Sequence, residues 1–347
     1  MRSVLWTTHP SGKVTPVAEA QKTCFVHIGV PKTGTTLLQR FFFENREALL
    51  KHGVLYPDVS LRGFGHHDIA FLIAGGYPDW ATPQPRTLSE LTTQLCNDVA
   101  RVDPTTVLLS SEDFYLFPAP GALLKLLETV KVAGRFRIVV IVYVRRQDLA
   151  HESWYNQTVK AQGATHRFDR SVLDTHALWD YEANLKRWAD VFGTENIVVR
   201  PFEQAQFAGG SLIGDLLSVL QLSANSFNPP SGRINTSLNK DLLEFQRLFN
   251  ALPMAVQDKR RFHRQLMDLS TAAQGNGRFN ETPFLDYEGR KALLQTYEAS
   301  NRAVARTYLQ RDHLFLDPVE NGPAPVDSHL TPEKLVSIFG ALMDSKG

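Results

Sequence analysis

The stretch Phe25-Val-His-Ile-Gly-Val-Pro-Lys-Thr-Gly-Thr-Thr-Leu-Leu-Gln-Arg40 contains the change of pattern that decides the fold. The residues from Cys24 to Ile28 form a short apolar run, which predicts a buried strand. Two glycines and a proline then break the pattern between Gly29 and Gly34. Hydroxyl side chains followed by spaced apolar residues from Thr35 onward predict the start of a helix. A strand, a glycine-containing loop and a helix N-terminus are together typical of a phosphate site, because loop N–H groups and the positive end of the helix dipole face the anion.

The spacing within this loop is close to that of a Walker A nucleotide loop, but the cation has moved. Gly29 and Gly34 are separated as in the G-x-x-x-x-G-K-[ST] pattern. Thr35 stands where that pattern has lysine, Thr36 keeps the Ser/Thr position, and Lys32 lies before the second glycine. The loop therefore predicts a phosphate cradle with a displaced cation. The alternative is an ordinary strand–turn–helix connection with a solvated lysine.

Strand and helix patterns alternate along the rest of the chain. Apolar runs predict further strands at 54–57, 105–111, 137–144 and 196–202, and the run from Arg137 to Val144 is continuous, as in a central parallel strand. Helical patterns are expected at 35–51, 66–73, 88–102, 120–131, 149–160, 181–192, 210–220, 239–252 and 290–310. This alternation predicts an α/β fold: a P-loop-containing, mainly parallel sheet flanked by helices, with helical additions in the C-terminal half. We expect residues 1–20 to form a loose N-terminal leader and residues 21–347 to form a single domain.

Composition narrows the class of protein. The chain has 347 residues, 43% of them hydrophobic, and a net charge of +1, so no bulk basic field indicates nucleic-acid binding. Cys24 and Cys96 are too few for a disulfide framework, and no Cys/His cluster has zinc spacing. No apolar run approaches the ~18 residues of a membrane span, and the first twenty residues contain no apolar secretory core. We therefore expect a cytoplasmic protein without a transmembrane segment.

Three predicted strands end in residues that can carry chemistry. The first ends in the Lys32 loop, the next in Ser110-Ser111-Glu112, and the third in Arg145-Arg146. Ligands of an open parallel sheet bind at the carboxyl ends of its strands, so we expect these residues to meet at one edge of the sheet.

Two of these segments resemble the nucleotide-binding motifs of the sulfotransferases that use 3′-phosphoadenosine 5′-phosphosulfate (PAPS). The run Pro31-Lys-Thr-Gly-Thr-Thr36 resembles their 5′-phosphosulfate loop. Arg145 and Ser153, eight positions apart, resemble the arginine and serine of their 3′-phosphate segment, although Gln147 stands near the usual proline. The resemblance covers about residues 23 to 160.

Within that family the chain resembles most the bacterial and carbohydrate sulfotransferase branch. The run from Val107 to Glu112 supports this branch, and the later run from Arg233 to Leu238 is similar to a segment of it. Asn235 and Ser237 are therefore candidate contacts, although such residues are more often turn and helix-cap residues.

The resemblance implies a transferase that moves a sulfuryl group from PAPS to an acceptor hydroxyl, leaving adenosine 3′,5′-bisphosphate (PAP). Lys32 would stabilise the leaving oxygen, and Arg145 with Ser153 would hold the 3′-phosphate. The 5′-phosphate would be held by the backbone amides of Thr33, Gly34, Thr35 and Thr36 and by the hydroxyls of Thr35 and Thr36. No metal is expected. The implied acceptor is a carbohydrate or glycolipid, which leaves contact with a membrane surface open, and the oligomeric state is not indicated.

The acceptor hydroxyl needs a base, and the sequence leaves the choice open. Glu112 follows the strand that carries a catalytic histidine in cytosolic relatives, but burial would have to raise its pKa. His67, with His66 ranked behind it, lies in the irregular segment after the first unit, and histidine needs little tuning. In the alternative interpretation, Glu112 forms an ion pair with Arg145 or Lys32, and the histidines are surface or cap residues.

Other functions also remain open at this point. Arg145 alone is equally explained by an ion pair with Asp148 or Glu152 at the end of the strand. A P-loop nucleotide kinase or NTPase would bind ATP with Mg²⁺, for which Glu112-Asp113 is the one acidic candidate. A non-catalytic PAP-binding protein would keep the loop and lack a working base.

Overall fold

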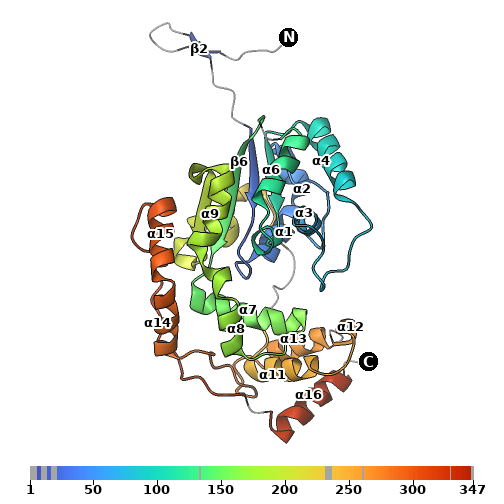
Figure 1. Ribbon diagram of the computed structural model, residues 1–347, viewed down its shortest axis with the longest axis vertical. Coiled ribbons are helices and arrows are strands. Elements are labelled where there is room, and N and C mark those ends of the chain that lie inside the picture. Colours follow the sequence, from blue (N-terminus) through green and yellow to red (C-terminus); the bar gives the residue numbers. More distant parts are fainter. Residues whose placement is uncertain are drawn as a thin grey trace.

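Five parallel strands form the centre of the protein (Figure 1). The computed structural model describes residues 6–8, 14–16, 22–132, 134–230, 237–259, 262–328 and 330–344. In order across the sheet the strands are β4 (Val54–Leu55), β5 (Thr106–Ser110), β3 (Thr23–His27), β6 (Arg137–Val144) and β7 (Ile197–Pro201). Each neighbouring pair is parallel, which confirms the predicted α/β fold.

The register of the sheet brings the ends of its three central strands level. His27, the last residue of β3, pairs with Ser110 of β5 and with Ile141 of β6. Hydrogen bonding to β6 continues past β3, because the Val30 N–H donates to the Tyr143 carbonyl at 3.3 Å. The loop that follows β3 is therefore held against the end of β6.

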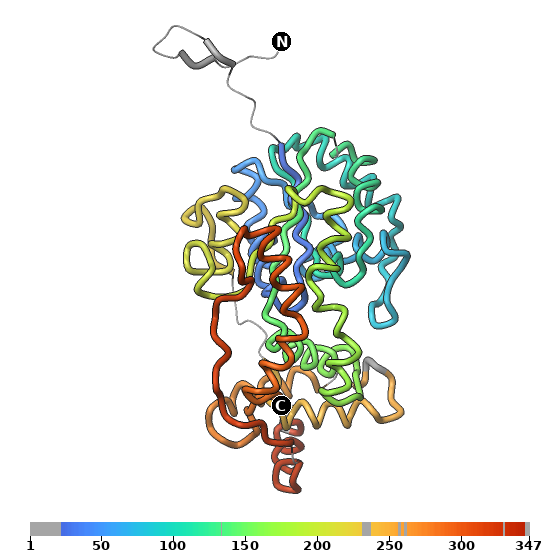
Figure 2. The backbone as a smooth tube through the Cα atoms, turned by 60° about the vertical axis from the view of Figure 1, so that its left-hand side comes forward, coloured from blue at the N-terminus to red at the C-terminus, as the bar shows by residue number. Residues whose placement is uncertain are grey.

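Alternate residues of the central strands face two layers of helices, because side chains of a strand point to opposite faces. Val26 and Val142 pack in a core with α4 (Leu88–Val102), α6 (Pro120–Thr129) and α9 (Tyr181–Phe192). Leu108 and Ile141 pack on the other face, with α1 (Thr35–Glu44) and α10 (Leu212–Val219). Helices thus cover both faces of the sheet, as the alternating sequence pattern predicts (Figure 2).

A third group of helices packs beyond the carboxyl ends of the strands (Figure 1). Tyr155 and Val159 of α7 (Gln147–Gln162) join a separate apolar cluster there. The same cluster contains residues of three later helices, which are α11 (Lys240–Asn250), α13 (His263–Ala272) and α16 (Pro332–Asp344). This is the helical addition predicted for the C-terminal half, and α7 connects it to the sheet.

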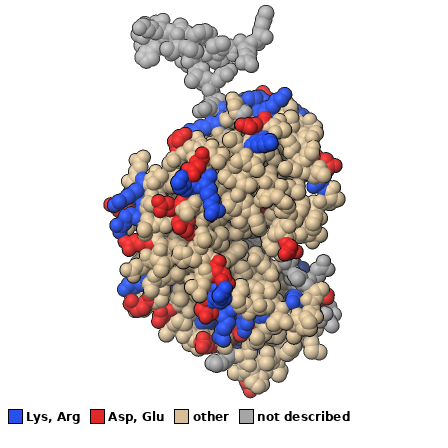
Figure 3. All heavy atoms as spheres, viewed as in Figure 1, with Lys and Arg blue, Asp and Glu red and all other residues tan. Residues whose placement is uncertain are grey.

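The remaining helices complete these layers. They are α2 (Arg46–Lys51), α3 (His67–Ile73), α5 (Asp113–Leu116), α8 (Phe168–Asp174), α12 (Val256–Lys259), α14 (Tyr287–Thr296) and α15 (Glu298–Leu309). Basic and acidic side chains are interspersed on the face shown in Figure 3, in keeping with the net charge of +1. Among the helices of the described residues, none combines the length and the apolarity that a membrane crossing needs.

Several segments differ from the sequence-based expectation. The helix expected at 35–51 is two helices, α1 and α2, which are separated by Asn45. The single helix expected at 290–310 is two helices, α14 and α15, which meet at Tyr297. Tyr297 is buried, its hydroxyl lies 2.9 Å from Nε2 of His151, and its ring stacks on His176, so internal contacts fix the chain at this point. Most of the expected leader lies outside the described residues, within which β1 (Trp6–Thr8) and β2 (Val14–Pro16) form an antiparallel pair.

Candidate active site

The loop between β3 and α1 forms a cradle of backbone amides. Gly34 precedes α1 with a φ of 75°, and Lys32 has a φ of 68°, so both lie in the left-handed region. A Cβ on Gly34 would lie 2.4 Å from Cδ2 of Leu212, so this position requires glycine for space as well as for conformation. Within the described residues, the backbone N–H groups from Lys32 to Leu37 make no backbone hydrogen bond. Such a run of unbonded amides at a helix start suits an anion.

The three threonines of the loop have different surroundings. Thr33 is fully buried, and its hydroxyl donates to the Val30 carbonyl at 2.6 Å, so this side chain holds the loop. Thr35 is buried and Thr36 is exposed, and both line the cavity described below. The hydroxyls of Thr35 and Thr36 are thus available to a ligand, while Thr33 offers its amide.

Lys32 provides a positive charge at the mouth of the cradle. Its ammonium makes no ion pair with any described residue, and the side chain lines the cavity. Burial and, after it, the positive charges of Lys160 and Arg145 lower the pKa of Lys32 to about 8, against the opposing charge of Glu112. At pH 7 most molecules therefore carry a protonated Lys32 with no counter-charge in contact with it.

Arg145 extends from the end of β6 to the same loop. Its Nη1 donates to the carbonyl of Lys32 at 2.9 Å, and its guanidinium lies over the ring of Phe202 at 5.7 Å. Its Nε is buried and has no hydrogen-bond partner among the described residues, although buried polar atoms are nearly always bonded. Burial lowers the pKa of Arg145. The guanidinium is thus fixed in position with part of its donor capacity unused.

The expected alternative, an ion pair from Arg145 to Asp148 or Glu152, is wrong. Asp148 instead pairs with Arg146 and with Arg290, each at 2.9 Å. Glu152 pairs with Arg290 at 2.8 Å. The two carboxylates stabilise α7 against neighbouring segments and leave Arg145 directed to the loop.

His67 and Asp113 form a pair on the opposite side of the cavity. His67 begins α3, Asp113 begins α5, and Nδ1 of the imidazole lies 2.6 Å from Oδ2 of the carboxylate. The Ser111 hydroxyl lies 2.9 Å from the same nitrogen and accepts the Asp113 N–H. If Nδ1–H donates to Asp113, Nε2 keeps its lone pair free. This is the arrangement in which a carboxylate orients a histidine for proton transfer.

Glu112 lies beside this pair. Within the described residues it forms no ion pair with Arg145 or Lys32, which were the partners expected in its alternative interpretation. Its Oε2 accepts from Nε2 of Gln39 at 2.7 Å. The condition for Glu112 to act as the base, a pKa raised by burial, is not met: burial raises the pKa of Glu112, but the positive charge of His67 and hydrogen bonds, among them that from Gln39, outweigh burial and leave it lowered. Glu112 is therefore a weak proton acceptor.

The pKa of His67 moves the other way. Burial lowers the pKa of His67, but the negative charges of Glu112 and Asp113 outweigh burial and leave it raised. Burial also raises the pKa of Asp113 in spite of that pairing. The two carboxylates thus stabilise a proton on His67, which makes the imidazole the stronger base.

His66, the third candidate base, is a structural residue. It is fully buried, its Nε2 lies 3.0 Å from the Pro57 carbonyl, and its Nδ1 accepts the Ser110 N–H at 3.1 Å. Burial lowers its pKa to about 4. With both ring nitrogens bonded to backbone and no surface on the cavity, His66 joins the end of β5 to the segment before α3.

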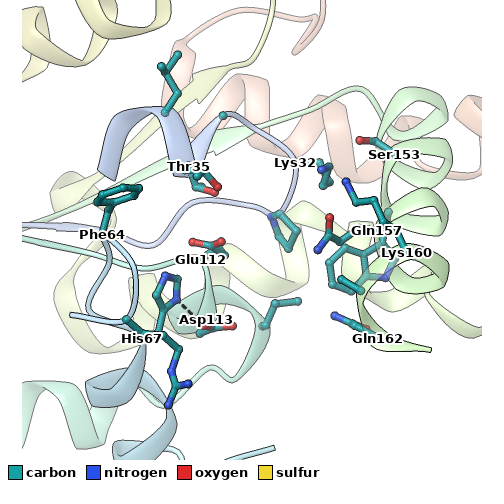
Figure 4. Close-up of a pocket in the computed structure, with 18 of the residues that line it drawn as sticks. Lys32, Thr35, Phe64, His67, Glu112, Asp113, Ser153, Gln157, Lys160 and Gln162 are labelled. Carbon is teal, nitrogen blue, oxygen red and sulfur yellow. Dashed lines mark hydrogen bonds and ion pairs between the residues drawn. The ribbon is translucent and has the colours of Figure 1, made fainter. Parts of the chain in front are cut away.

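One cavity of about 810 Å³ joins most of these features, whereas Thr33 and His66 are not part of its lining (Figure 4). Of the predicted residues it is lined by Lys32, Gly34, Thr35, Thr36, His67, Glu112, Arg145 and Ser153. Figure 4 shows Thr35 and Lys32 above it, His67 and Asp113 on one side, Glu112 in the middle, and Ser153 on α7 on the other side. The strand ends expected to meet at one edge of the sheet therefore do so. Ser237 also lines the cavity, whereas Asn235 lies outside the described residues.

Sequence reasoning missed several residues of this cavity, among them two on α7. Gln157 and Lys160 lie on the same wall as Ser153, and Figure 4 shows all three directed inward from α7. The signal was present in the sequence, because positions 153, 157 and 160 are spaced as one face of a helix. Among the described residues, no group of three or more His, Cys, Asp or Glu side chains is arranged to hold a metal ion.

Comparisons with known proteins do not place the chain in a family. No known family model matches the chain. An uncharacterised protein of Archaeoglobus fulgidus is 28% identical over 179 residues, which are 51% of this chain and 47% of that protein, so the chain spans about half the length of this relative. A solved sulfotransferase from Alicyclobacillus acidocaldarius covers 71% of this chain and 100% of its own, with a TM-score of 0.40 and 18% identity. A likeness of this strength carries no functional inference, so the function proposed below rests on the residues of the site.

Proposed function

We propose that the protein is a sulfotransferase that moves a sulfuryl group from PAPS to an acceptor hydroxyl. The observation that supports this most is the position of Arg145. A single guanidinium donates to the loop carbonyl of Lys32, keeps unused donor capacity, and lines the same cavity as Ser153. An arginine in this position suits a second phosphate beyond the one that the loop amides can hold.

The residues present fit a nucleotide with separate 5′ and 3′ phosphates. The unbonded amides from Lys32 to Leu37 would hold the 5′-phosphate together with the Thr35 and Thr36 hydroxyls. Arg145 and Ser153 would hold the 3′-phosphate. When bound, PAPS supplies an activated sulfuryl group whose bond to a phosphate oxygen can break.

Lys32 would act on the leaving side of the reaction. In such a transfer the acceptor oxygen bonds to sulfur while the bond from sulfur to the bridging phosphate oxygen breaks, and negative charge grows on that oxygen. A protonated, unpaired ammonium at the loop stabilises this charge as it forms. We therefore assign leaving-group stabilisation to Lys32.

His67 is the base that we propose, with Asp113 as its positioning residue. Asp113 accepts a hydrogen bond from the Nδ1–H group of His67. The other ring nitrogen, Nε2, is then left to take the proton of the acceptor hydroxyl. Glu112, whose pKa is lowered, stays ionised and stabilises the imidazolium that results. The proposal therefore favours His67 over Glu112 as the base, a choice that the sequence leaves open.

The acceptor that we propose is a carbohydrate or glycolipid. Aromatic side chains line the end of the cavity near His67: Phe64, Phe71 and Trp80. Trp80 is 36% exposed and stands nearly perpendicular to the Phe71 ring at 5.6 Å, so part of its surface is available to a ligand. Sugar rings present C–H faces that pack on such aromatic surfaces, while their hydroxyls reach polar groups.

Thermal unfolding with PAP, with ATP and with ATP–Mg²⁺ tests the nucleotide assignment. A ligand that binds only the folded state stabilises it by about 2.7 kcal/mol at a concentration 100 times its Kd. We expect PAP to raise the melting temperature more than ATP–Mg²⁺ does. Stabilisation by ATP–Mg²⁺ and not by PAP would refute the proposal in favour of a nucleotide kinase or NTPase.

Transfer from labelled PAPS to a panel of sugar and glycolipid acceptors tests catalysis itself. Lys32→Ala should abolish most turnover and reduce PAP affinity only modestly, because the charge matters most in the transition state. The exposed Lys51→Ala serves as a matched control. PAP binding without transfer to any acceptor would instead indicate a non-catalytic PAP-binding protein.

A further inference from the structure

The polar side chains of α7 fall into two sets. Those directed toward the protein are all bonded: Gln147 to Asn301, Asp148 to Arg146, His151 to Tyr297, Glu152 to Arg290, Asn156 to Leu238 and Thr158 to Tyr155. The side chains of Ser153, Gln157, Lys160 and Gln162 make no hydrogen bond or ion pair within the described residues, and all four line the cavity. The unbonded set thus coincides with the face of α7 that a ligand would contact (Figure 4).

Lys160 is the exceptional member of this set. It is only 5% exposed, and a buried ammonium without a partner is costly. The positive charge of Lys160 lowers the pKa of Lys32, so the two cations act on each other across the cavity. Burial lowers the pKa of Lys160. Two unpaired lysines on one cavity repel each other, and an anion between them would relieve the repulsion.

The position of Lys160 along α7 indicates which anion this is. Lys160 lies seven residues beyond Ser153, which is about 10 Å along a helix at ~1.5 Å per residue. The proposed function already assigns Ser153 and Arg145 to the 3′-phosphate and the loop amides to the 5′-phosphate. The remaining anionic group of PAPS is the sulfonate attached at the 5′ end, across the ribose from the 3′-phosphate.

We propose that Lys160, with Gln157 beside it, binds the sulfonate that PAPS carries and PAP lacks. This inference rests on the proposed function and adds a positioning residue to it. One helix then contacts the donor nucleotide at both ends, through Ser153 at the 3′-phosphate and through Lys160 at the group to be transferred.

This arrangement also favours product release. With PAPS bound, the sulfonate lies between Lys160 and Lys32 and offsets their repulsion. After transfer the sulfonate has left with the acceptor, and the negative charge of the broken bond stays on the phosphate oxygen at Lys32, so Lys160 has lost the anionic group that it contacted. PAP is then bound less tightly than PAPS by the contacts that Lys160 makes.

The test compares the affinities of PAPS and PAP for Lys160→Met, in the full chain and without acceptor. Methionine keeps much of the length of the side chain and removes its charge. A hydrogen bond to a charged group changes a binding constant by roughly ten- to a hundred-fold. We expect PAPS affinity to fall by about this factor and PAP affinity to stay within a few-fold, so that the ratio of the two Kd values approaches one.

Three controls make the outcome decisive. Lys125→Met, on the exposed face of α6, should leave both affinities unchanged. Lys160→Arg should restore part of the preference for PAPS. Gln157→Met should lower the preference to a smaller extent, and it provides a second variant if Lys160→Met melts early.

Each other result overturns the inference. Equal losses of PAPS and PAP affinity would mean that Lys160 contacts a phosphate or supports the fold. An unchanged ratio with a raised KM for the acceptor would place Lys160 in the acceptor site. Failure of the unsubstituted protein to bind PAP would refute the proposed function itself, and that result is distinct from both of these.

Discussion

Replacing Asp113 by asparagine should change both the rate of the reaction and its dependence on pH. The carboxylate lies 2.6 Å from Nδ1 of His67. Asparagine has almost the same shape, but its amide group can donate to Nδ1. Such a bond favours the tautomer with the proton on Nε2, which is the nitrogen that must accept the proton of the acceptor. Asp113→Asn therefore blocks the base without removing it.

The size of the effect follows from what a positioned base contributes. General-base assistance is typically worth about 10²–10⁴ in rate, and we expect kcat of Asp113→Asn to fall by a factor in this range. In the unsubstituted protein the neutral imidazole is the active form, and the pKa of His67 is raised above its usual 6.5. Turnover should thus rise with pH through a pKa above 6.5 and fall about tenfold for each pH unit below it. Removing the Asp113 charge should move this limb to lower pH.

The assay is kcat for sulfuryl transfer at saturating PAPS between pH 5 and 9, with Asp190→Asn on the surface of α9 as control. PAP affinity at pH 7 checks that the nucleotide half of the site is intact. Turnover that stays level down to pH 5 would instead indicate Glu112 as the base, because the pKa of Glu112 is lowered from its usual 4.5. Full activity of Asp113→Asn would refute the role of the pair.

Three further substitutions test other parts of the structure. Gly34→Ala should weaken PAP binding measured by calorimetry by at least tenfold, because its Cβ would lie 2.4 Å from Leu212 at a φ of 75°; unchanged binding would show that the cradle tolerates a side chain. Arg145→Ala should weaken PAP far more than the analogue without a 3′-phosphate, and equal losses would mean that the guanidinium does not contact that phosphate. Asp215→Ala removes a fully buried carboxylate bonded to Arg200, so the free energy of unfolding in urea should fall by about 3–5 kcal/mol, whereas a change below 1 kcal/mol would contradict a buried pair.

The fold was predictable because its signals are local. The strand from Arg137 to Val144 and the helices at 88–102 and 181–192 match the structure at both ends. Continuous apolar runs and 3.6-residue periodicity determine these elements before any tertiary contact does. The break at Tyr297 was not predictable, because it depends on His151 and His176, which lie far away in the sequence.

The residues of the candidate site that belong to a sequence motif were predictable. Those whose role depends on tertiary contacts were not. The loop and Arg145 could be recognised from spacing alone. The difference between His66 and His67 could not, because adjacent histidines in one sequence segment differ only in what surrounds them. The direction of the Glu112 pKa likewise depends on its distance from His67, which the sequence does not contain.

Because α7 lines the cavity and also packs against the C-terminal helices, nucleotide binding should affect those helices. Its outer face is tied to the C-terminal helices: Asn156 exchanges hydrogen bonds with the backbone of Leu238, and the Val159 carbonyl accepts from Asn250 at 2.8 Å. The C-terminal helices and the α7 wall of the cavity should therefore open together, as one cooperative unit. Nucleotide should therefore slow amide hydrogen exchange in α11, a helix that lines none of the cavity.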